Sequence, residues 1–251
     1  MPDDQSMKDS HLQPAPVDLA GLPRGDLEAM AAAGAEIEEV RRVLRKTGDN
    51  VVSEILRGQG TFYEWDHYPA GDVYDSESHS QYYYHAHPVG QRFEREHGHF
   101  HSFLRAQGMP EGIEPVALPA GPGPKEPEDA LSHLIAISMD ADGEPFRLFT
   151  VNRWVTAEVW HHGADVCRLL DCFRVDHAQP SWPANRWITA MMALFKPQVR
   201  ALVEIRDRTV DGYQRQHPER DVFEDRDLEV TSYLDISIDR QIREIEAALR
   251  T

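Results

Sequence analysis

The stretch between residues 80 and 105 alternates histidines with aromatic and aliphatic residues, and a turn interrupts it. Histidine occupies every second position in two short runs, first at His85 and His87 and then at His97, His99 and His101. Successive side chains of a β-strand point to opposite faces, so each run places its histidines on one face. The Pro-Val-Gly sequence at 88–90 separates the runs and is typical of a turn. The pattern predicts two strands joined as an antiparallel hairpin.

The same alternation predicts which residues of the two strands face each other. With residues 88–96 as the loop, three pairs are opposed: His87 with His97, His85 with His99, and Tyr83 with His101. Opposed residues of antiparallel strands point to the same side, so all five imidazoles share a face. The reverse face then carries an apolar and aromatic set: Tyr82, Tyr84, Ala86, Phe100 and Leu104. A register slipped by one residue would break up this set, which favours the first register.

A metal ion would explain why five imidazoles are clustered on one face. Without a metal they would repel one another when protonated, and would compete for few hydrogen-bond acceptors when neutral. Imidazole is a ligand for Zn, Cu, Fe and Ni. We expect His85, His87 and His99 to form a tripod around one ion, with a fourth position left open. His97 and His101 are then reserve ligands, around the same ion or around a second one.

Other side chains near the predicted hairpin are candidates for catalysis. Tyr83 lies on the hairpin itself, and Asp66 lies on a predicted strand beside it, where each could supply an acid or base group. Glu158 is expected on the first helix after the sheet, on the same face as His162 four residues later. Glu96 falls in the predicted hairpin loop and is expected at the surface.

Several functions are compatible with this site. The first is a metal-dependent enzyme acting on a small molecule, with Fe or Cu favoured slightly because tyrosines surround the histidines. A Zn-dependent hydrolase or hydratase is an alternative, since Zn would activate a bound water. A metal-binding or sensing protein without turnover, and a metal-free histidine cleft that responds to pH, also remain open. Arg147 and Arg153 are candidates for binding an anionic substrate, although surface ion pairs would also explain them.

The arrangement of elements along the chain predicts the fold class. Strands are predicted at 61–68, 80–87, 97–105, 133–139, 146–154 and 228–236. Helices are predicted at 27–44, 50–56, 156–173, 184–195, 197–214 and 238–249. We therefore expect an α+β protein: an antiparallel sheet of about five or six strands, with helices packed on one face and N-terminal helices preceding it. Residues 1–22 are expected to be a disordered tail, and residues 23–251 a single domain with a proline-rich loop at 110–128.

Composition limits the partners of the chain. Lys and Arg number 26 and Asp and Glu number 43, which gives a formal charge of −17. This acidity argues against nucleic acid and against an anionic membrane surface as partners. No apolar stretch approaches the roughly 20 residues that cross a membrane. The N-terminus lacks a secretory signal, and Cys167 and Cys172 are too few for a disulfide scaffold, so we expect a cytoplasmic monomer or homodimer.

Overall fold

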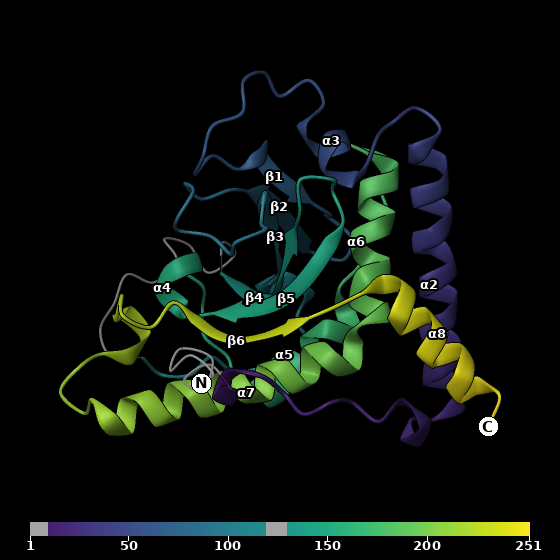
Figure 1. Cartoon of the computed structure of the whole chain (residues 1–251). Helices are drawn as coiled ribbons and strands as arrows, with labels where there is room; N and C mark the ends of the chain where they lie inside the picture. Colours follow the sequence, from purple (N-terminus) through teal and green to yellow (C-terminus); the bar gives the residue numbers. More distant parts are fainter. Residues whose placement is uncertain (1–9, 119–129) are drawn as a thin grey trace, which may run out of the picture.

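The computed structural model describes residues 10–118 and 130–251. Its centre is one antiparallel sheet of six strands that follow one another in chain order from edge to edge (Figure 1). The strands are β1 (Tyr68–Tyr74), β2 (Ser80–His85), β3 (Gly98–Arg105), β4 (Leu131–Met139), β5 (Pro145–Val151) and β6 (Val230–Asp235). Neighbours in the sequence therefore pair as neighbours in space, as expected for antiparallel connections.

Helices precede the sheet and follow it. In the described residues they are α2 (Arg24–Arg45), α3 (Val51–Leu56), α4 (Arg153–Thr156), α5 (Gly163–Leu169), α6 (Trp182–Leu194), α7 (Lys196–Gln216) and α8 (Ile238–Leu249). Short 3-10 turns lie at Ser10–Leu12, Leu19–Gly21, Ala106–Gly108, Leu170–Cys172 and Val222–Glu224. The architecture confirms the α+β prediction, including the sheet of six strands and the N-terminal helices before it.

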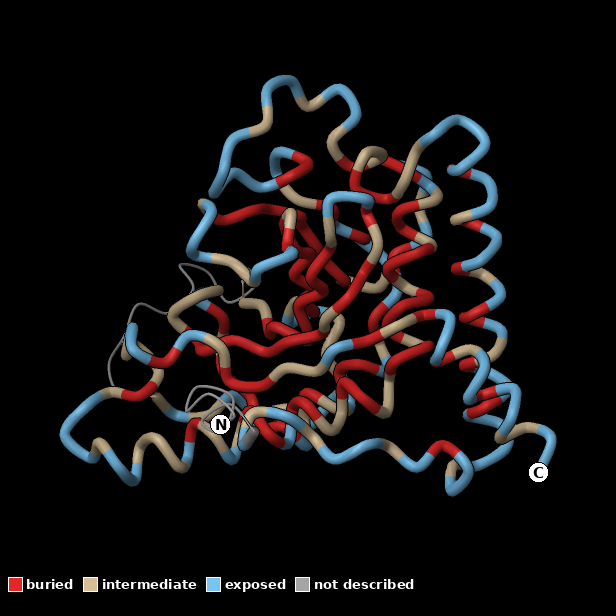
Figure 2. Tube along the Cα trace, viewed as in Figure 1, coloured by how far each residue is buried: buried red, intermediate tan, exposed pale blue. Residues whose placement is uncertain are grey.

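The main core lies between the sheet and the helices on one of its faces. Tyr82, Tyr84 and Phe100, the set predicted for the reverse face of the hairpin, are all fully buried there. The Tyr82 hydroxyl donates to Asn185 Oδ1 of α6 at 2.5 Å, which satisfies a polar group that burial would otherwise leave unpaired. In Figure 2 the buried part of the trace follows the middle strands and the inner side of α6.

Gly34 explains how a second layer of helices packs closely. The sequence places it inside the apolar stripe of α2, where a glycine weakens a helix. A Cβ at this position would lie 2.9 Å from Ile242 Cγ1 of α8. The glycine therefore allows α8 to pack directly against α2.

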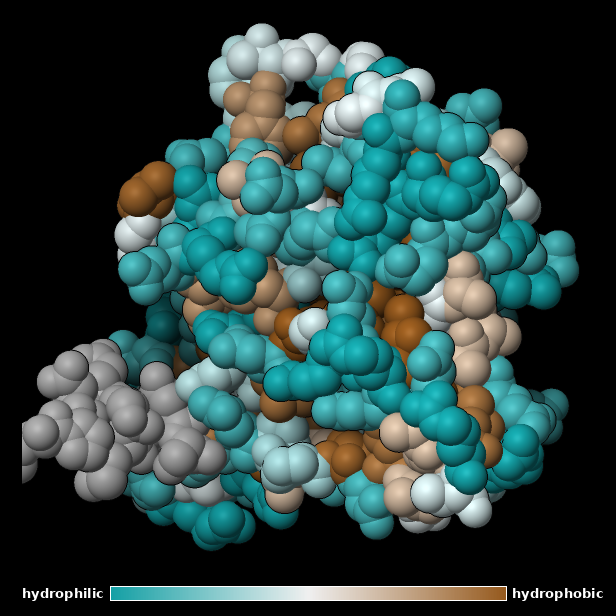
Figure 3. Space-filling model, turned by 45° about the vertical axis from the view of Figure 1, so that its right-hand side comes forward, coloured by the Kyte–Doolittle hydropathy of each residue, from teal (hydrophilic) through white to brown (hydrophobic). Residues whose placement is uncertain are grey.

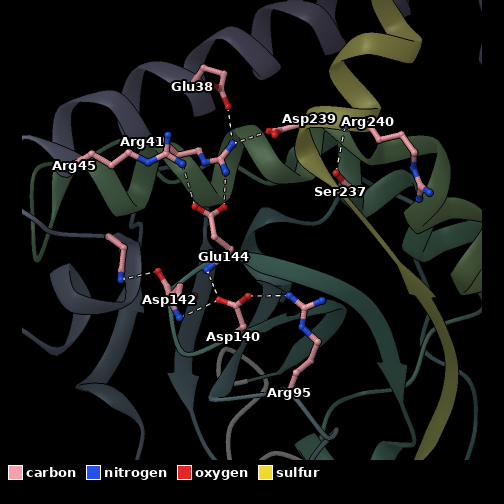
Figure 4. A network of polar contacts seen from close by, with 11 residues as sticks. Glu38, Arg41, Arg45, Arg95, Asp140, Asp142, Glu144, Ser237, Asp239 and Arg240 are labelled. Atoms are coloured by element: carbon pink, nitrogen blue, oxygen red, sulfur yellow. Dashed lines mark hydrogen bonds and ion pairs between the residues drawn. The ribbon is translucent and has the colours of Figure 1, made fainter.

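An ion-pair network fixes these helices to one end of the sheet (Figure 4). Glu144, in the turn between β4 and β5, accepts from Arg41 Nη2 at 2.5 Å and from Arg45 Nη2 at 3.2 Å. Arg41 also donates to Asp239 Oδ1 at 3.0 Å, at the beginning of α8. One arginine of α2 thus joins three elements, and pairs joined in a network contribute more than isolated surface pairs.

Two predicted elements differ in the structure. Residues 61–67 are not a strand but a loop, in which Trp65 adopts a left-handed φ of 72° and donates its amide to Ala86 O. The strand begins only at Tyr68. The predicted helix at 156–173 is interrupted because Ala157 is left-handed and Val159 N donates to Leu131 O, so this segment extends beside β4 before α5 begins.

The predicted tail and loop each lie partly outside the described residues. Within the tail at 1–22, Leu19 is buried in the main core and the turn at Leu19–Gly21 contacts α8. Residues 1–9 lie outside the description. In the proline-rich loop, Val116 and Leu118 pack against a small cluster around Trp160, and residues 119–128 lie outside the description.

The surface of the protein is mainly hydrophilic on the face drawn in Figure 3. Apolar residues form separate patches between the hydrophilic side chains. Among the described residues, the structure contains no helix with the length and apolar character needed to cross a membrane.

Candidate metal centre

The hairpin of β2 and β3 carries the histidines on the face opposite the main core. His85 pairs with His99, and Tyr83 pairs with His101, which confirms the predicted register for these residues. Aromatic neighbours continue on the same face of β5, where Phe149 lies 5.2 Å from His99 between ring centroids. Alternation along two paired strands therefore separates an apolar core from a buried polar cluster.

Three imidazoles of this face converge on one point. One ring nitrogen each from His85, His99 and His101 lies within 4.8 Å of the other two, and all three residues are buried. His85 Nε2 and His99 Nε2 are 2.7 Å apart. His101 Nε2 is buried with no hydrogen-bond partner among the described residues. A tetrahedral ion with bonds of about 2.1 Å holds its ligands about 3.4 Å apart, which lies between the 2.7 Å separation of His85 from His99 and the 4.8 Å limit for the trio.

Two further side chains orient two of the three rings from outside. Glu96 Oε1 lies 2.7 Å from His99 Nδ1, and Ser138 Oγ of β4 donates to Glu96 Oε2 at 2.5 Å. His133 Nε2 of β4 lies 2.9 Å from His101 Nδ1. Each contact occupies Nδ1 and leaves Nε2 for the point of convergence. Carboxylates and other acceptors bound to the far nitrogen of a ligand imidazole are a general feature of metal sites.

Burial favours the neutral form, which binds metals, in three histidines of the cluster. It lowers the pKa of His85 to about 2, assisted by the neighbouring His99. It lowers the pKa of His133 to about 3, and it holds the pKa of His101 well below the usual value. Burial alone would raise the pKa of Glu96, but its interactions with His99, Ser138 and His87 together outweigh burial and hold that pKa below its usual range. Neutral imidazoles beside an ionised carboxylate are ready to bind a cation.

The grouping differs from the predicted tripod of His85, His87 and His99, because His101 takes the place of His87. His87 nevertheless lies next to the trio, with its ring centroid 4.9 Å from His85 and 5.1 Å from His99. Its Nδ1 is 3.2 Å from Gln91 O, and Trp65 stacks on it at 4.4 Å. His87 is thus placed at the edge of the cluster.

The prediction that His97 shares this face is corrected. β3 begins at Gly98, and His97 precedes it with its Nδ1 2.6 Å from the hydroxyl of Tyr84, a residue of the helix-covered face. A Cβ at residue 98 would lie 2.6 Å from this hydroxyl and 2.5 Å from His85 O. The glycine therefore lets Tyr84 pass the strand and reach His97.

Tyr83 lies beside two of the three histidines, whereas Asp66 lies on an exposed loop. Tyr83 is buried, with its ring centroid 5.3 Å from those of both His85 and His101, and burial raises the pKa of its hydroxyl. Asp66 is exposed, on the loop that replaces the predicted strand. The neighbouring His67 stacks on Tyr83 at 3.6 Å and lies 3.0 Å from Asp72 Oδ1.

Glu158 lies in the extended segment beside β4, not on a helix. Its Oε2 accepts from the backbone N of His133 at 2.7 Å, and its other oxygen from Thr156 Oγ1 at 3.4 Å, so the predicted helix face shared with His162 is wrong. Burial raises the pKa of Glu158 to about 7, although Arg206 acts in the opposite direction. The Glu158 carboxyl is therefore hydrogen-bonded to the backbone of β4, the strand that carries His133.

The two arginines predicted to bind substrate are held by carboxylates. Arg147 Nε donates to Asp235 Oδ1 at 2.6 Å, and its guanidinium lies 4.2 Å from the Phe93 ring centroid. Arg153 is buried and forms an ion pair with Glu224. Both arginines form ion pairs, as the alternative interpretation expected, but the pair of Arg153 is buried and not at the surface.

A pocket of about 260 Å³ opens directly onto the cluster. His87, His99, His101 and Glu96 form part of its lining, together with side chains of the 88–96 loop, β5, α4 and the beginning of β6. Sequence reasoning assigned Glu96 to the surface and did not single out His133. A glutamate three residues before His99 was the available signal for Glu96, whereas the face to which His133 points depends on the pairing of β4 with β3.

The fold and the site define an α+β protein with a buried histidine triad that could hold a metal ion. Residues 31–236 match a family described as a domain of unknown function, DUF6969. The match covers most of the chain and contains all the histidines of the cluster, so the chain belongs to this family. No curated protein and no solved structure matches the chain.

Proposed function

We propose that the chain is a metal-dependent enzyme in which His85, His99 and His101 hold one divalent transition metal at the floor of a pocket for a small molecule. The observation that carries the proposal is the convergence of three buried imidazoles, one of them with an unpaired Nε2. A buried nitrogen without a partner costs free energy, and a metal ion would remove that cost.

The pocket supports an enzyme in preference to a purely structural site. Structural zinc sites use four protein ligands, whereas catalytic sites keep a position open for water or substrate. Here three imidazoles converge, and the pocket reaches His99 and His101 from one side. A ligand entering the pocket would therefore approach the open position of the ion.

The ligand set and its surroundings favour Fe or Cu. Three imidazoles without a thiolate suit Fe, Cu and Zn alike, so the side chains around the site must distinguish between these metals. The buried Tyr83 lies beside two of the ligands, where a phenol can donate a proton or a hydrogen atom to a ligand of a redox metal. We therefore propose an oxidoreductase as the first candidate function.

A Zn-dependent hydrolase or hydratase is the second candidate, and Glu229 is the observation that favours it. This carboxylate lines the pocket, and burial raises its pKa. A carboxylate in that position could accept the proton of a metal-bound water.

Metal analysis of protein purified without a polyhistidine tag tests the proposal. We expect about one equivalent of metal per chain, and loss of most of it in His85→Ala and His101→Ala. His162→Ala is the matched control, because this histidine is exposed and makes no capping hydrogen bond with its side chain. Less than about a tenth of an equivalent, with no uptake from Fe(II), Cu(II) or Zn(II), would overturn the metal site.

A second measurement separates an enzyme from a metal-binding or sensing protein. In Co(II)- or Cu(II)-loaded protein, added azide should change the visible spectrum if a coordination position is open to the pocket. An unchanged spectrum would indicate a saturated ion, and would argue for binding without turnover. An EPR signal in the protein as purified would select a redox metal over Zn.

A further inference from the structure

The walls of the pocket above the histidines are apolar. They are formed by Phe93, Phe149, Val151, Val155 and Val230. An engineered apolar cavity of about 150 Å³ is large enough for benzene. The pocket, at about 260 Å³, therefore has room for a substituted benzene ring or a short acyl chain. Its walls favour a molecule whose body is hydrophobic.

Arg92 brings a positive charge to the same pocket. It lies on the loop between β2 and β3, is half-buried, and lines the cavity. Its Nη1 donates to His97 O at 2.6 Å, which fixes the guanidinium and leaves other N–H groups unused. Within the described residues it makes no ion pair. Arg95, three residues later, is paired with Asp140 at 2.9 Å, and Arg147 with Asp235.

The carboxylates of the pocket do not neutralise this arginine. Both oxygens of Glu96 are occupied, one by His99 and the other by Ser138. Glu229 also lines the pocket and makes no ion pair among the described residues. A half-buried guanidinium without a carboxylate partner is suited to bind a ligand carboxylate through two parallel hydrogen bonds.

We propose that the pocket binds a small carboxylic acid with an apolar body, whose carboxylate is held by Arg92. The part of this inference that directs the other end of the acid to the metal rests on the proposed function. The carboxylate site itself rests only on Arg92 and the apolar walls. It also replaces the predicted roles of Arg147 and Arg153, whose guanidinium groups are held by protein carboxylates.

Calorimetric titration with phenylacetate and its neutral analogue phenylacetamide tests the inference. The two probes have nearly the same size and differ in charge. We expect metal-loaded wild-type protein to bind phenylacetate at least about tenfold more tightly than phenylacetamide. Arg92→Gln should abolish this preference and leave phenylacetamide binding unchanged. Arg92→Lys, which keeps the charge but not the paired hydrogen bonds, should retain part of it.

Arg95→Gln is the matched control, because Arg95 is on the same loop but does not line the pocket. It should keep the full preference for the acid. Equal affinity of wild type for the two probes, no binding of either probe, or an equal loss in Arg95→Gln and Arg92→Gln would overturn the inference. Circular dichroism of each variant confirms that it is folded.

Metal content measured in every sample separates this inference from the proposed function. Full metal occupancy without a preference for phenylacetate would refute the carboxylate site alone. A preference for phenylacetate that depends on Arg92, in protein that never takes up metal, would refute the metalloenzyme and leave the carboxylate site standing. Repeating the titration after EDTA treatment shows whether the acid binds to the arginine or only to the metal.

Discussion

Acid should destabilise the metal-free protein through the buried histidines, and His133 offers the clearest measurement. In the folded chain its pKa is about 3, whereas an exposed histidine has a pKa of about 6.5. Below about pH 6.5 the unfolded chain therefore binds a proton that the folded chain refuses. The stability associated with His133 is complete above that pH and is lost progressively as the pH falls toward 3.

The size of the effect follows from these values. Each such histidine costs about 1.4 kcal/mol of unfolding free energy per pH unit below about 6.5, which is about 2 kcal/mol at pH 5. His85, whose pKa is about 2, contributes a loss of similar size. Because whole domains are stable by only about 5–15 kcal/mol, a loss of about 4 kcal/mol from two residues is a large fraction.

Urea unfolding followed by circular dichroism at pH 7, 6 and 5, in EDTA, provides the assay. His133→Gln removes one titrating group and keeps an amide that can bond to His101. Relative to wild type, this variant should gain about 2 kcal/mol of unfolding free energy between pH 7 and pH 5. The exposed His162→Gln should follow the wild type throughout. The reasoning is refuted if the difference between His133→Gln and wild type stays constant over this range.

Three further substitutions have definite expected outcomes. Gly98→Ala should destabilise the protein by about 2 kcal/mol or more in urea unfolding, because its Cβ would lie 2.5 Å from the immobile His85 O. Glu158→Gln should raise the unfolding free energy by about 3.5 kcal/mol at pH 8 and leave it nearly unchanged at pH 4, because a folded pKa of about 7 means that ionisation of this carboxyl opposes folding. Glu96→Gln should weaken metal affinity about tenfold or more in a competition titration with a chelator, while unfolding of the metal-free protein changes by less than about 2 kcal/mol.

The hairpin register could be predicted because both faces of β2 and β3 carry a distinct chemistry. Tyr82 and Phe100 on one face, and His85 and His99 on the other, leave one pairing that keeps apolar residues together. The order of strands followed from short connections with clear turn residues. These signals are local in the sequence, so they could be found without knowing what packs on the sheet.

The participation of His133 could not be predicted, because it depends on an irregular pairing between β3 and β4. Ser102 pairs with Ile135, but Phe103 pairs with His133, so one residue of β4 is passed over. With regular alternation from Ala136, which opposes His101, an odd-numbered residue such as His133 would point to the helix-covered face. The bulge reverses this parity and brings His133 to His101. Nothing in the sequence of a single strand marks where such a bulge falls.

The buried histidine face is difficult to explain by folding alone. The helix-covered face of the same strands is filled with tyrosine, phenylalanine and leucine, which stabilise by burial. Replacing the triad by apolar residues of similar volume would remove a buried nitrogen without a partner and several depressed pKa values. A chain under selection only for stability has no reason to keep them. The buried imidazoles therefore favour a role in binding, and a metal ion at their point of convergence would supply that role.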